Sequence, residues 1–373
     1  MDNNNGQVFS LSFAAIDPYV ETNITDNFEK EIKGKEFISW GSGNDYPNYL
    51  FGLYNDVTTL RTICNGIADY AVGENVTCNF MASNDAEDLV HKLALDLAIY
   101  GGYALEVHRG LDGQVKGVRY LDIRKVRSNK KNTVYFYSED WGHTYGRVNY
   151  LEYPAFDRNN AYRTDEDGNR KVIGTSIYVY KMSHNMVYPS PMYAGNGCWA
   201  AEIEKSIVQY QLNAINNGFA GNYIINFNGG SNPDDKLKQE TERNIREKFC
   251  GYKNAGRPIL SWNKSKDNEA TIAVLPVDNF ADRFNSLQTV SKHELFSAFR
   301  AHPVIFGLPS QNLGFSDEPF ETAWGLFNKT VIRPIQRKIT NTFDYIYGQN
   351  DAMTIEPFSV DWESESDNNT EVE

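Results

Sequence analysis

The chain has 373 residues, of which 41% are hydrophobic and 13% aromatic, and its formal net charge at pH 7 is −13. This is the composition of a globular protein with room for two or three domains, and it excludes a largely disordered chain. Proteins that grip duplex DNA neutralise its phosphates with Lys and Arg, so the acidic balance argues against tight non-specific DNA binding. It still allows DNA to slide past as a cargo.

No apolar run approaches the roughly eighteen residues that a membrane helix requires. The N-terminal sequence also lacks the positive-then-apolar layout of a signal peptide, so we expect a protein made and kept in the cytoplasm, with no membrane partner. The four cysteines are scattered without a C-x-x-C pair, which indicates reduced thiols: Cys64, Cys78, Cys198 and Cys250.

The first half of the chain predicts helices followed by strands. Residues 1–36 are polar, with a weak strand pattern over 8–13, and we expect an arm that orders only against a neighbour. One helix is predicted over 56–73 with Gly73 as its C-cap, and Asn84 with Glu87 predicts a capping box for a second helix that ends at Gly101. We then expect a hairpin of strands 103–108 and 115–123, strands at 133–137, 148–153 and 176–182, and a polar loop at 158–172.

The middle of the chain predicts a helix over residues 199–217 that is apolar on two sides. One stripe contains Trp199, Ile203, Ile207, Tyr210 and Ala214, and the second contains Val208, Leu212 and Ile215. Such a helix must be covered on two sides. An αβ unit follows, with strands expected at 222–227, 258–262 and 271–277 and a helix from Pro233 to about Cys250.

The stretch from Phe280 to Ile346 predicts two helices around a loop. The first helix has Phe284, Leu287, Ser291, Leu295 and Phe299 on one face and ends before Pro303. The loop 303–316 has two prolines, two glycines and almost no charge, which is apolar for an exposed loop. The second helix begins at Ser316 or Asp317, and Pro334 should kink it.

A search for catalytic groups finds none. The six histidines are spread along the chain, and no Walker A, Rossmann or nucleophile-elbow pattern is present. We therefore predict a mechanical or structural protein, not an enzyme, with no cofactor and no metal. Two alternatives stay open: a metal-dependent nuclease or processing enzyme that uses some of the 49 carboxylates, and a surface glycan-binding protein built on the tyrosine-rich strands, which would require export.

The order of elements over residues 40–345 resembles the portal proteins of tailed bacteriophages, the rings at one capsid vertex through which DNA is packaged and ejected. The resemblance is carried by the order and spacing of several short segments together with Pro334. They are Gly43-Asn-Asp-Tyr-Pro47, Gly102-Tyr-Ala-Leu105, Leu121-Asp-Ile-Arg-Lys-Val126, Asn254-Ala-Gly-Arg-Pro-Ile-Leu260 and Phe299-Arg-Ala-His-Pro-Val-Ile-Phe-Gly-Leu308.

The resemblance implies an α+β portal-type fold with a mixed α/β wing, a two-helix stem, a small αβ clip, a tunnel loop and a long kinked C-terminal helix. The expected boundaries are an N-terminal arm (1–36), the first part of the wing (37–198), stem helix 1 (199–220), the clip (221–278), stem helix 2 (279–302), the tunnel loop (303–316), the kinked wing or crown helix (317–350) and an acidic tail (351–373). In such a ring, neighbouring subunits would cover the two-sided stem helix and the apolar loop.

The resemblance also implies partners and a location. The chain would form a homo-oligomeric ring, a dodecamer in the capsid, that contacts the major capsid protein, the terminase large subunit and head-tail connector proteins, with double-stranded DNA passing through. It would be assembled in the host cytoplasm and reside in the virion at the portal vertex. Candidate DNA-proximal residues in the tunnel loop are Ser310, Gln311 and Asn312. Candidates for terminase or adaptor docking at the clip tip are Lys264, Lys266 and Asp267.

Overall fold

The structure is a computed structural model of the chain. It describes residues 29–31, 36–41, 43–141, 149–165, 167–183, 186–216, 224–227, 236, 239, 240, 243, 259–262, 280–307 and 318–358. The chain divides into two compact units: unit 1 is Met1–Trp199 with Glu294–Glu373, and unit 2 is Ala200–His293. The unit boundaries fall inside two helices, α5 (Asn196–Asn216) and α7 (Phe280–Ala298).

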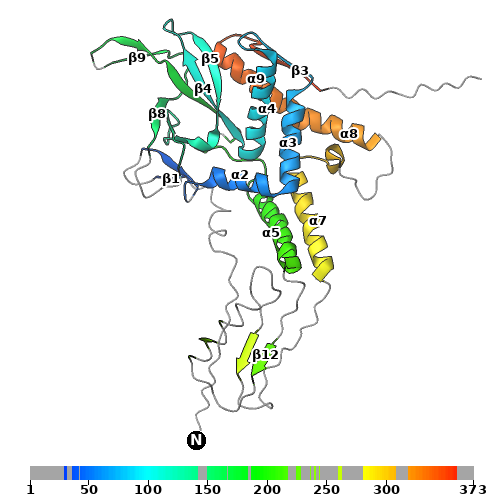
Figure 1. The fold of residues 1–373 in the computed structure, drawn as a ribbon. Helices are drawn as coiled ribbons and strands as arrows, with labels where there is room; N and C mark the ends of the chain where they lie inside the picture. The colour runs from blue at the N-terminus through cyan, green and yellow to red at the C-terminus, as the bar shows by residue number, and fades with distance from the viewer. Residues whose placement is uncertain are drawn as a thin grey trace, which may run out of the picture. The chain divides into compact units, whose positions relative to one another are not determined.

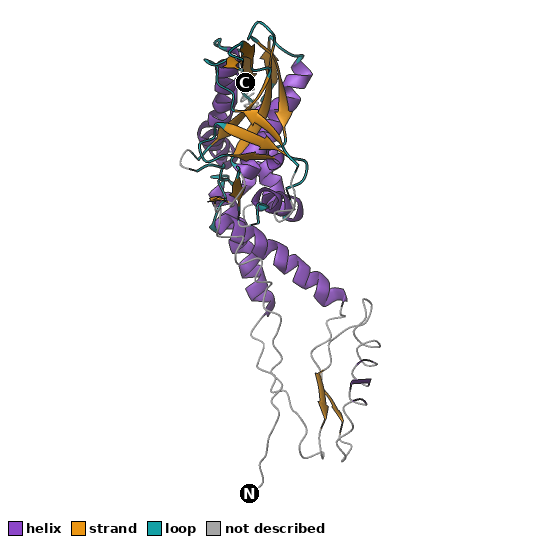
Figure 2. Cartoon of the chain, turned by 90° about the vertical axis from the view of Figure 1, so that its left-hand side faces the viewer, coloured by secondary structure: helices purple, strands orange, loops and turns teal. Residues whose placement is uncertain are grey.

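Unit 1 combines a layer of helices with a layer of strands, which Figure 2 shows in purple and orange. Helices α3 and α4 pack side by side, and α9 packs against both (Figure 1). The mixture of helices and strands is the α+β class that the sequence predicts. Its helices are α2 (Tyr46–Asp56), α3 (Thr58–Val72), α4 (Ser83–Tyr100), α8 (Glu318–Phe327) and α9 (Arg333–Tyr347), with single turns η1 (Ile123–Lys125) and η3 (Pro303–Phe306).

The predicted helix at 56–73 is confirmed as α3, which buries Leu60, Ile63 and Ile67 and ends at the C-cap Gly73. The predicted capping box of the next helix is wrong, because α4 begins at Ser83 and its N-cap is Ala82, two residues before Asn84. Ser83 does not cap the helix, since its hydroxyl donates a hydrogen bond to the Val76 carbonyl (2.7 Å) in the preceding strand β3 (Asn75–Cys78).

The end of α4 lies where the sequence predicts it. Gly101 has a left-handed backbone (φ 76°), and a Cβ at this position would lie 2.0 Å from the Ser190 carbonyl oxygen. Only glycine fits there, because it both adopts the left-handed conformation and allows the close approach of a second backbone. The chain therefore turns directly from α4 into strand β4 (Gly102–Arg109).

The strands form small sheets. The predicted hairpin is confirmed, since β4 pairs antiparallel with β5 (Val115–Leu121) and on its other side with β11 (Thr175–Lys181). A second sheet has the order β6-β7-β8, a third pairs β3 with β14, and β1 pairs with β2. Their bounds are β1 (Glu29–Glu31), β2 (Ile38–Trp40), β6 (Val126–Ser128), β7 (Val134–Tyr137), β8 (Leu151–Pro154) and β14 (Met353–Glu356).

The segment 158–172, expected as a polar loop, instead contains a hairpin of β9 (Tyr162–Thr164) and β10 (Arg170–Val172). The Asp165 carboxylate organises its turn by accepting hydrogen bonds from the backbone amides of Asp167 (3.1 Å) and Asn169 (2.7 Å). Polar side chains on both strands concealed the strand pattern, since neither face of a short, exposed hairpin needs to be apolar.

The long C-terminal helix is also confirmed, over Glu318–Tyr347. The distortion expected at Pro334 takes the form of a π-helical turn, η4 (Asn328–Ile332), immediately before α9. Proline donates no backbone hydrogen bond and crowds the carbonyl four residues earlier. A wider turn relieves this crowding, which gives a physical reason for its position.

A buried arginine joins two of the segments that carry the family resemblance. Arg127 on β6 is fully buried and donates from Nε to Oδ1 of Asn44 (2.5 Å) and from Nη2 to the Asn44 carbonyl (2.7 Å). Its Nη1 donates to the carbonyls of Arg124 and Val126, both at 2.8 Å. Burial lowers the pKa of Arg127 to about 10. The guanidinium therefore ties the turn before α2 to the second sheet.

Unit 2 contains most of α5 and α7 together with strands β12 (Ile224–Phe227) and β13 (Ile259–Trp262). The two strands are parallel, as Figure 1 shows, and pair in register from Ile224 with Ile259 to Phe227 with Trp262. Parallel neighbours require a crossover connection, as expected for an αβ unit. The strand predicted at 271–277 lies outside the described residues.

Candidate functional site

The structure does not place the six predicted site residues. Ser310, Gln311 and Asn312 lie outside the described residues, and so do Lys264, Lys266 and Asp267. The described residues that bear on function are the two helices of unit 2 and, in unit 1, the root of the predicted tunnel loop.

Helix α5 keeps one face covered and leaves apolar side chains exposed on both flanks of it. Ile207 is buried. On one flank Ile203 is 37% and Tyr210 53% exposed, and on the other flank Val208 is 53% and Leu212 55% exposed. The predicted helix over 199–217 is confirmed as α5. In its first predicted stripe Ile207 is buried while Ile203 and Tyr210 are exposed, and the expectation that both apolar sides are covered stays a prediction.

Helix α7 also carries exposed apolar side chains, on one flank of a buried residue. Ser291 is buried, whereas Leu287 is 47% and Val290 54% exposed, one helical turn apart. The two helices meet through the stacked rings of Tyr210 and Phe284, whose centroids lie 5.0 Å apart. Of the residues predicted to share one face of this helix, Ser291, Leu295 and Phe299 are buried, whereas Leu287 is exposed.

These exposed side chains form what we call the α5/α7 surface: Ile203, Val208, Tyr210, Leu212, Leu287 and Val290. Single exposed apolar residues are ordinary on a monomer, but a set of them on two adjoining helices is typical of a surface that another protein covers. Full burial of one Val or Leu side chain stabilises by about 1.5–3 kcal/mol, so covering these half-exposed side chains contributes roughly 1 kcal/mol each.

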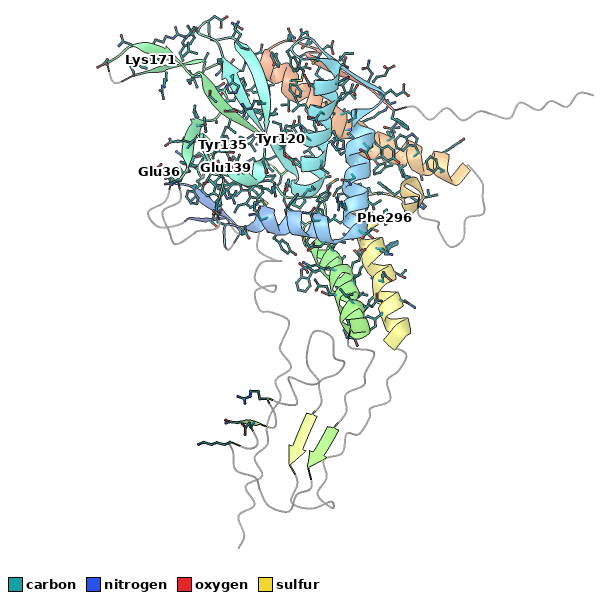
Figure 3. The ribbon with its side chains drawn as sticks, in the orientation of Figure 1. Glu36, Tyr120, Tyr135, Glu139, Lys171 and Phe296 are labelled. Atoms are coloured by element: carbon teal, nitrogen blue, oxygen red, sulfur yellow. The ribbon has the colours of Figure 1, made fainter. Side chains whose placement is uncertain are left out.

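The root of the predicted tunnel loop is packed within unit 1. Ile305 is buried, and its carbonyl accepts a hydrogen bond from the Tyr70 hydroxyl (2.9 Å). The Phe306 ring contacts the rings of Tyr70, Phe296 and Phe327 at centroid distances of 6.3, 5.8 and 5.8 Å. Figure 3 labels Phe296, close to the end of α7 that belongs to unit 1.

This packing corrects one expectation. We expected the apolar character of the whole loop to reflect burial in a ring, but residues 303–306 are apolar because they pack against α3 and α8 of their own chain. Their close fit includes Gly66, where a Cβ would lie 2.5 Å from Cε1 of Phe306. Gly307 then has a left-handed backbone, and residues 308–317 lie outside the described residues.

The most perturbed carboxyl group lies elsewhere in unit 1. Asp96 on α4 is buried, and its Oδ1 accepts a hydrogen bond from the Tyr120 hydroxyl (3.2 Å), while its Oδ2 has no hydrogen-bond partner among the described residues. Burial raises the pKa of Asp96 well above its usual range, and the nearby Asp122 raises it further. Arg124 holds the Asp122 carboxylate through two nitrogens, Nε (3.0 Å) and Nη2 (2.7 Å).

A perturbed acid can mark an active site. Asp96, however, has no histidine, second free carboxylate or nucleophile among its described contacts, and it joins α4 to β5 through Tyr120. The part of the chain that the structure describes contains no group of three or more His, Cys, Asp or Glu side chains placed to hold a metal ion. In the same residues no helix is long and apolar enough to span a membrane.

No family model matches the sequence, and no curated protein matches it significantly. Among solved structures, the chain is similar to the neck of a native gene transfer agent particle computed with C12 symmetry, at 13% identity over 83% of this chain and 84% of that chain, with a TM-score of 0.47. It is also similar to the virion of the native particle, at 13% identity over 83% of each chain and a TM-score of 0.45.

A third similar structure is an HK97-family phage portal protein from Corynebacterium diphtheriae. The identity is 10% over 82% of this chain and 92% of that chain, with a TM-score of 0.44. It is a member of the class that the sequence resembles. Identities and TM-scores this low carry no functional conclusion for this chain.

Proposed function

We propose that this chain is the subunit of a portal-type ring, a channel for viral DNA at one vertex of a capsid. The observation that carries the proposal is the α5/α7 surface, where six apolar side chains are exposed on two adjoining helices of unit 2. In a closed ring each subunit presents one patch to the neighbour on one side and a different patch to the other. Apolar side chains on both flanks of α5 meet that requirement.

The energy available from this surface fits self-association. Four aliphatic side chains of the surface, Val208, Leu212, Leu287 and Val290, would contribute roughly 4 kcal/mol on burial, which is about a thousand-fold in an association constant. An aspartate placed among them would lose this term and would also have to bury an unpaired charge.

The test replaces Val208 and Leu212 with Asp in the full chain and measures particle mass by native mass spectrometry and negative-stain imaging. We expect the wild type to form rings and Val208→Asp/Leu212→Asp to stay monomeric with an unchanged circular dichroism spectrum. The matched control is Leu151→Asp on β8, which is 59% exposed in unit 1 and should form rings as the wild type does. Ring formation by the double variant, or a wild type that remains monomeric even with capsid partners, would refute the proposal.

The finer roles follow from the sequence resemblance. The ring would have twelve subunits, reside in the virion after assembly in the host cytoplasm, and catalyse no reaction. DNA would pass the loop that contains Ser310, Gln311 and Asn312, whose uncharged groups can touch phosphates without holding them. Replacing these three residues with Glu should spare ring assembly and lower the amount of packaged DNA, and unchanged packaging would remove the loop from this role.

Docking is proposed for the clip tip, where Lys264, Lys266 and Asp267 would contact the terminase large subunit during packaging and a head-tail connector afterwards. The ring would also contact the major capsid protein. Reversing the charges of Lys264 and Lys266 should weaken terminase binding in a pull-down without altering the ring. If wild-type and charge-reversed rings retained equal amounts of terminase, Lys264 and Lys266 would be excluded as docking residues.

A further inference from the structure

On unit 1, helix α9 and strand β14 border an open hollow of about 360 Å³. The α9 side contributes Arg333, Arg337 and Thr340, and the other side is formed by Ile355 and by Pro357, which directly follows β14. This is a junction between the long C-terminal helix and the last described strand of the chain.

The helix side of the hollow is strongly basic. Arg333 and Arg337 are exposed and one turn apart, an arrangement of like charges that destabilises a helix by a few tenths of a kcal/mol. Lys338 follows them, and its pKa is lowered by burial and by the nearby Arg337 and Arg300. Within the described part of the chain, no ion pair with an acidic side chain is formed by Arg300, Arg333, Arg337 or Lys338.

An acidic segment of the same chain begins beside this hollow. Residues 359–373 contain six Asp or Glu residues and no Lys or Arg, in a chain whose net charge is already −13. The residue before the segment, Phe358, is held by ring contacts with Trp324 (5.7 Å) and Tyr70 (6.0 Å). At about 3.3 Å per residue, the first acids of the segment are within reach of α9.

We propose that the acidic segment 359–373 docks onto the Arg333/Arg337 face of α9 and occupies the hollow there. Its carboxylates pair with the two guanidinium groups and relieve their mutual repulsion. Covalent attachment places the segment at an effective concentration in the millimolar range, so weak ion pairs suffice to hold it against free anions. The docked segment also screens this basic face from other polyanions, including DNA phosphates, and this holds whether or not the chain forms a ring.

The test follows cleavage of the intact chain by a glutamate-specific protease, with cuts after Glu363 and Glu365 quantified by mass spectrometry. At about 20 mM salt, where charge screening is weak, we expect Arg333→Gln/Arg337→Gln to be cut roughly two- to five-fold faster than the wild type. The difference should vanish near 500 mM salt. Arg119→Gln/Arg163→Gln removes two exposed arginines from β5 and β9 and should be cut at the wild-type rate.

A second variant perturbs the segment and leaves the folded part untouched. Asp361→Asn/Asp367→Asn preserves both cleavage sites and should also be cut faster than the wild type at low salt. Equal cleavage of the wild type and the Arg333/Arg337 variant at low salt would overturn the proposal. The proposal would also be overturned if duplex DNA bound through Arg333 and Arg337 with the same affinity to the wild type and to Asp361→Asn/Asp367→Asn. The Arg333/Arg337 face would then bind an external polyanion and not the acidic segment.

Discussion

Replacement of Arg127 with Met should destabilise unit 1 more than any surface change. The substitution removes a guanidinium that makes four hydrogen bonds and lies over the rings of Trp40 (5.6 Å) and Trp141 (5.0 Å). The Asn44, Arg124 and Val126 carbonyls would lose a charged donor in a buried site, at a cost of about 1–3 kcal/mol each. Relief from burying the charge offsets part of that cost.

The net loss should be about 2–4 kcal/mol, because the acceptors left without a donor outweigh the relief from burying the charge. This is a large share of the roughly 5–15 kcal/mol that stabilises a typical domain. Arg127→Lys should fall between the wild type and Arg127→Met, since an ammonium keeps the charge but cannot reproduce the planar fork that reaches Asn44 and two further carbonyls.

The assay is urea unfolding at pH 7 followed by tryptophan fluorescence and by circular dichroism. Two probes are needed because the chain has two units and unfolding need not be two-state. Arg163→Met, on the exposed strand β9, serves as the control and should leave the midpoint unchanged. An Arg127→Met variant whose stability lies within about 0.5 kcal/mol of this control, the usual spread for surface substitutions, would refute the reasoning.

Three further predictions concern the described residues of unit 1. Burial raises the pKa of Asp96, so its contribution to stability is fully present below the unfolded-state pKa and is lost as the pH rises through the folded-state pKa. Asp96→Asn should therefore stabilise the protein at pH 8 and have little effect at pH 4, and urea midpoints that differ equally at both pH values would contradict this. Gly66→Ala should destabilise the protein, because the added Cβ would clash with the Phe306 ring. In a Phe306→Ala background the same substitution should stabilise by up to about 1 kcal/mol, because alanine has the higher helix propensity. A double-mutant cycle measured by thermal unfolding that lacks this change of sign would contradict the packing. Arg300, just after α7, has a left-handed backbone (φ 54°). Arg300→Gly should therefore raise stability by about 1 kcal/mol in thermal unfolding. A loss of stability would show that the side chain of Arg300 contributes more than its backbone strain costs.

The sequence predicts the local elements of this fold well because they depend on neighbours along the chain. The apolar spacing in 56–73 indicates α3, Gly101 indicates the end of α4, and alternation at 103–108 indicates β4. These signals need only the helical or strand period and the conformational range of glycine.

The sequence predicts less where a residue's role depends on a distant partner. Arg127 lies between Val126 and Ser128 in a short strand, and its position shows no sign of Asn44, which is 83 residues earlier. An arginine between two buried positions indicates a charge that points inward, but the burial of Val126 and Ser128 is known only from the structure. Likewise, the apolar residues 303–306 could be assigned to their own chain only once Tyr70, Phe296 and Phe327 were placed around Phe306.

The α5/α7 surface shows the same division. By itself, the sequence determined that the helix at 199–217 is apolar on two sides, because periodicity is a property of the chain alone. Only the tertiary structure decided that Ile207 is buried while Val208 and Leu212 remain exposed. The reason is physical: burial depends on which elements pack against a helix, and those elements come from parts of the chain that are far apart in sequence.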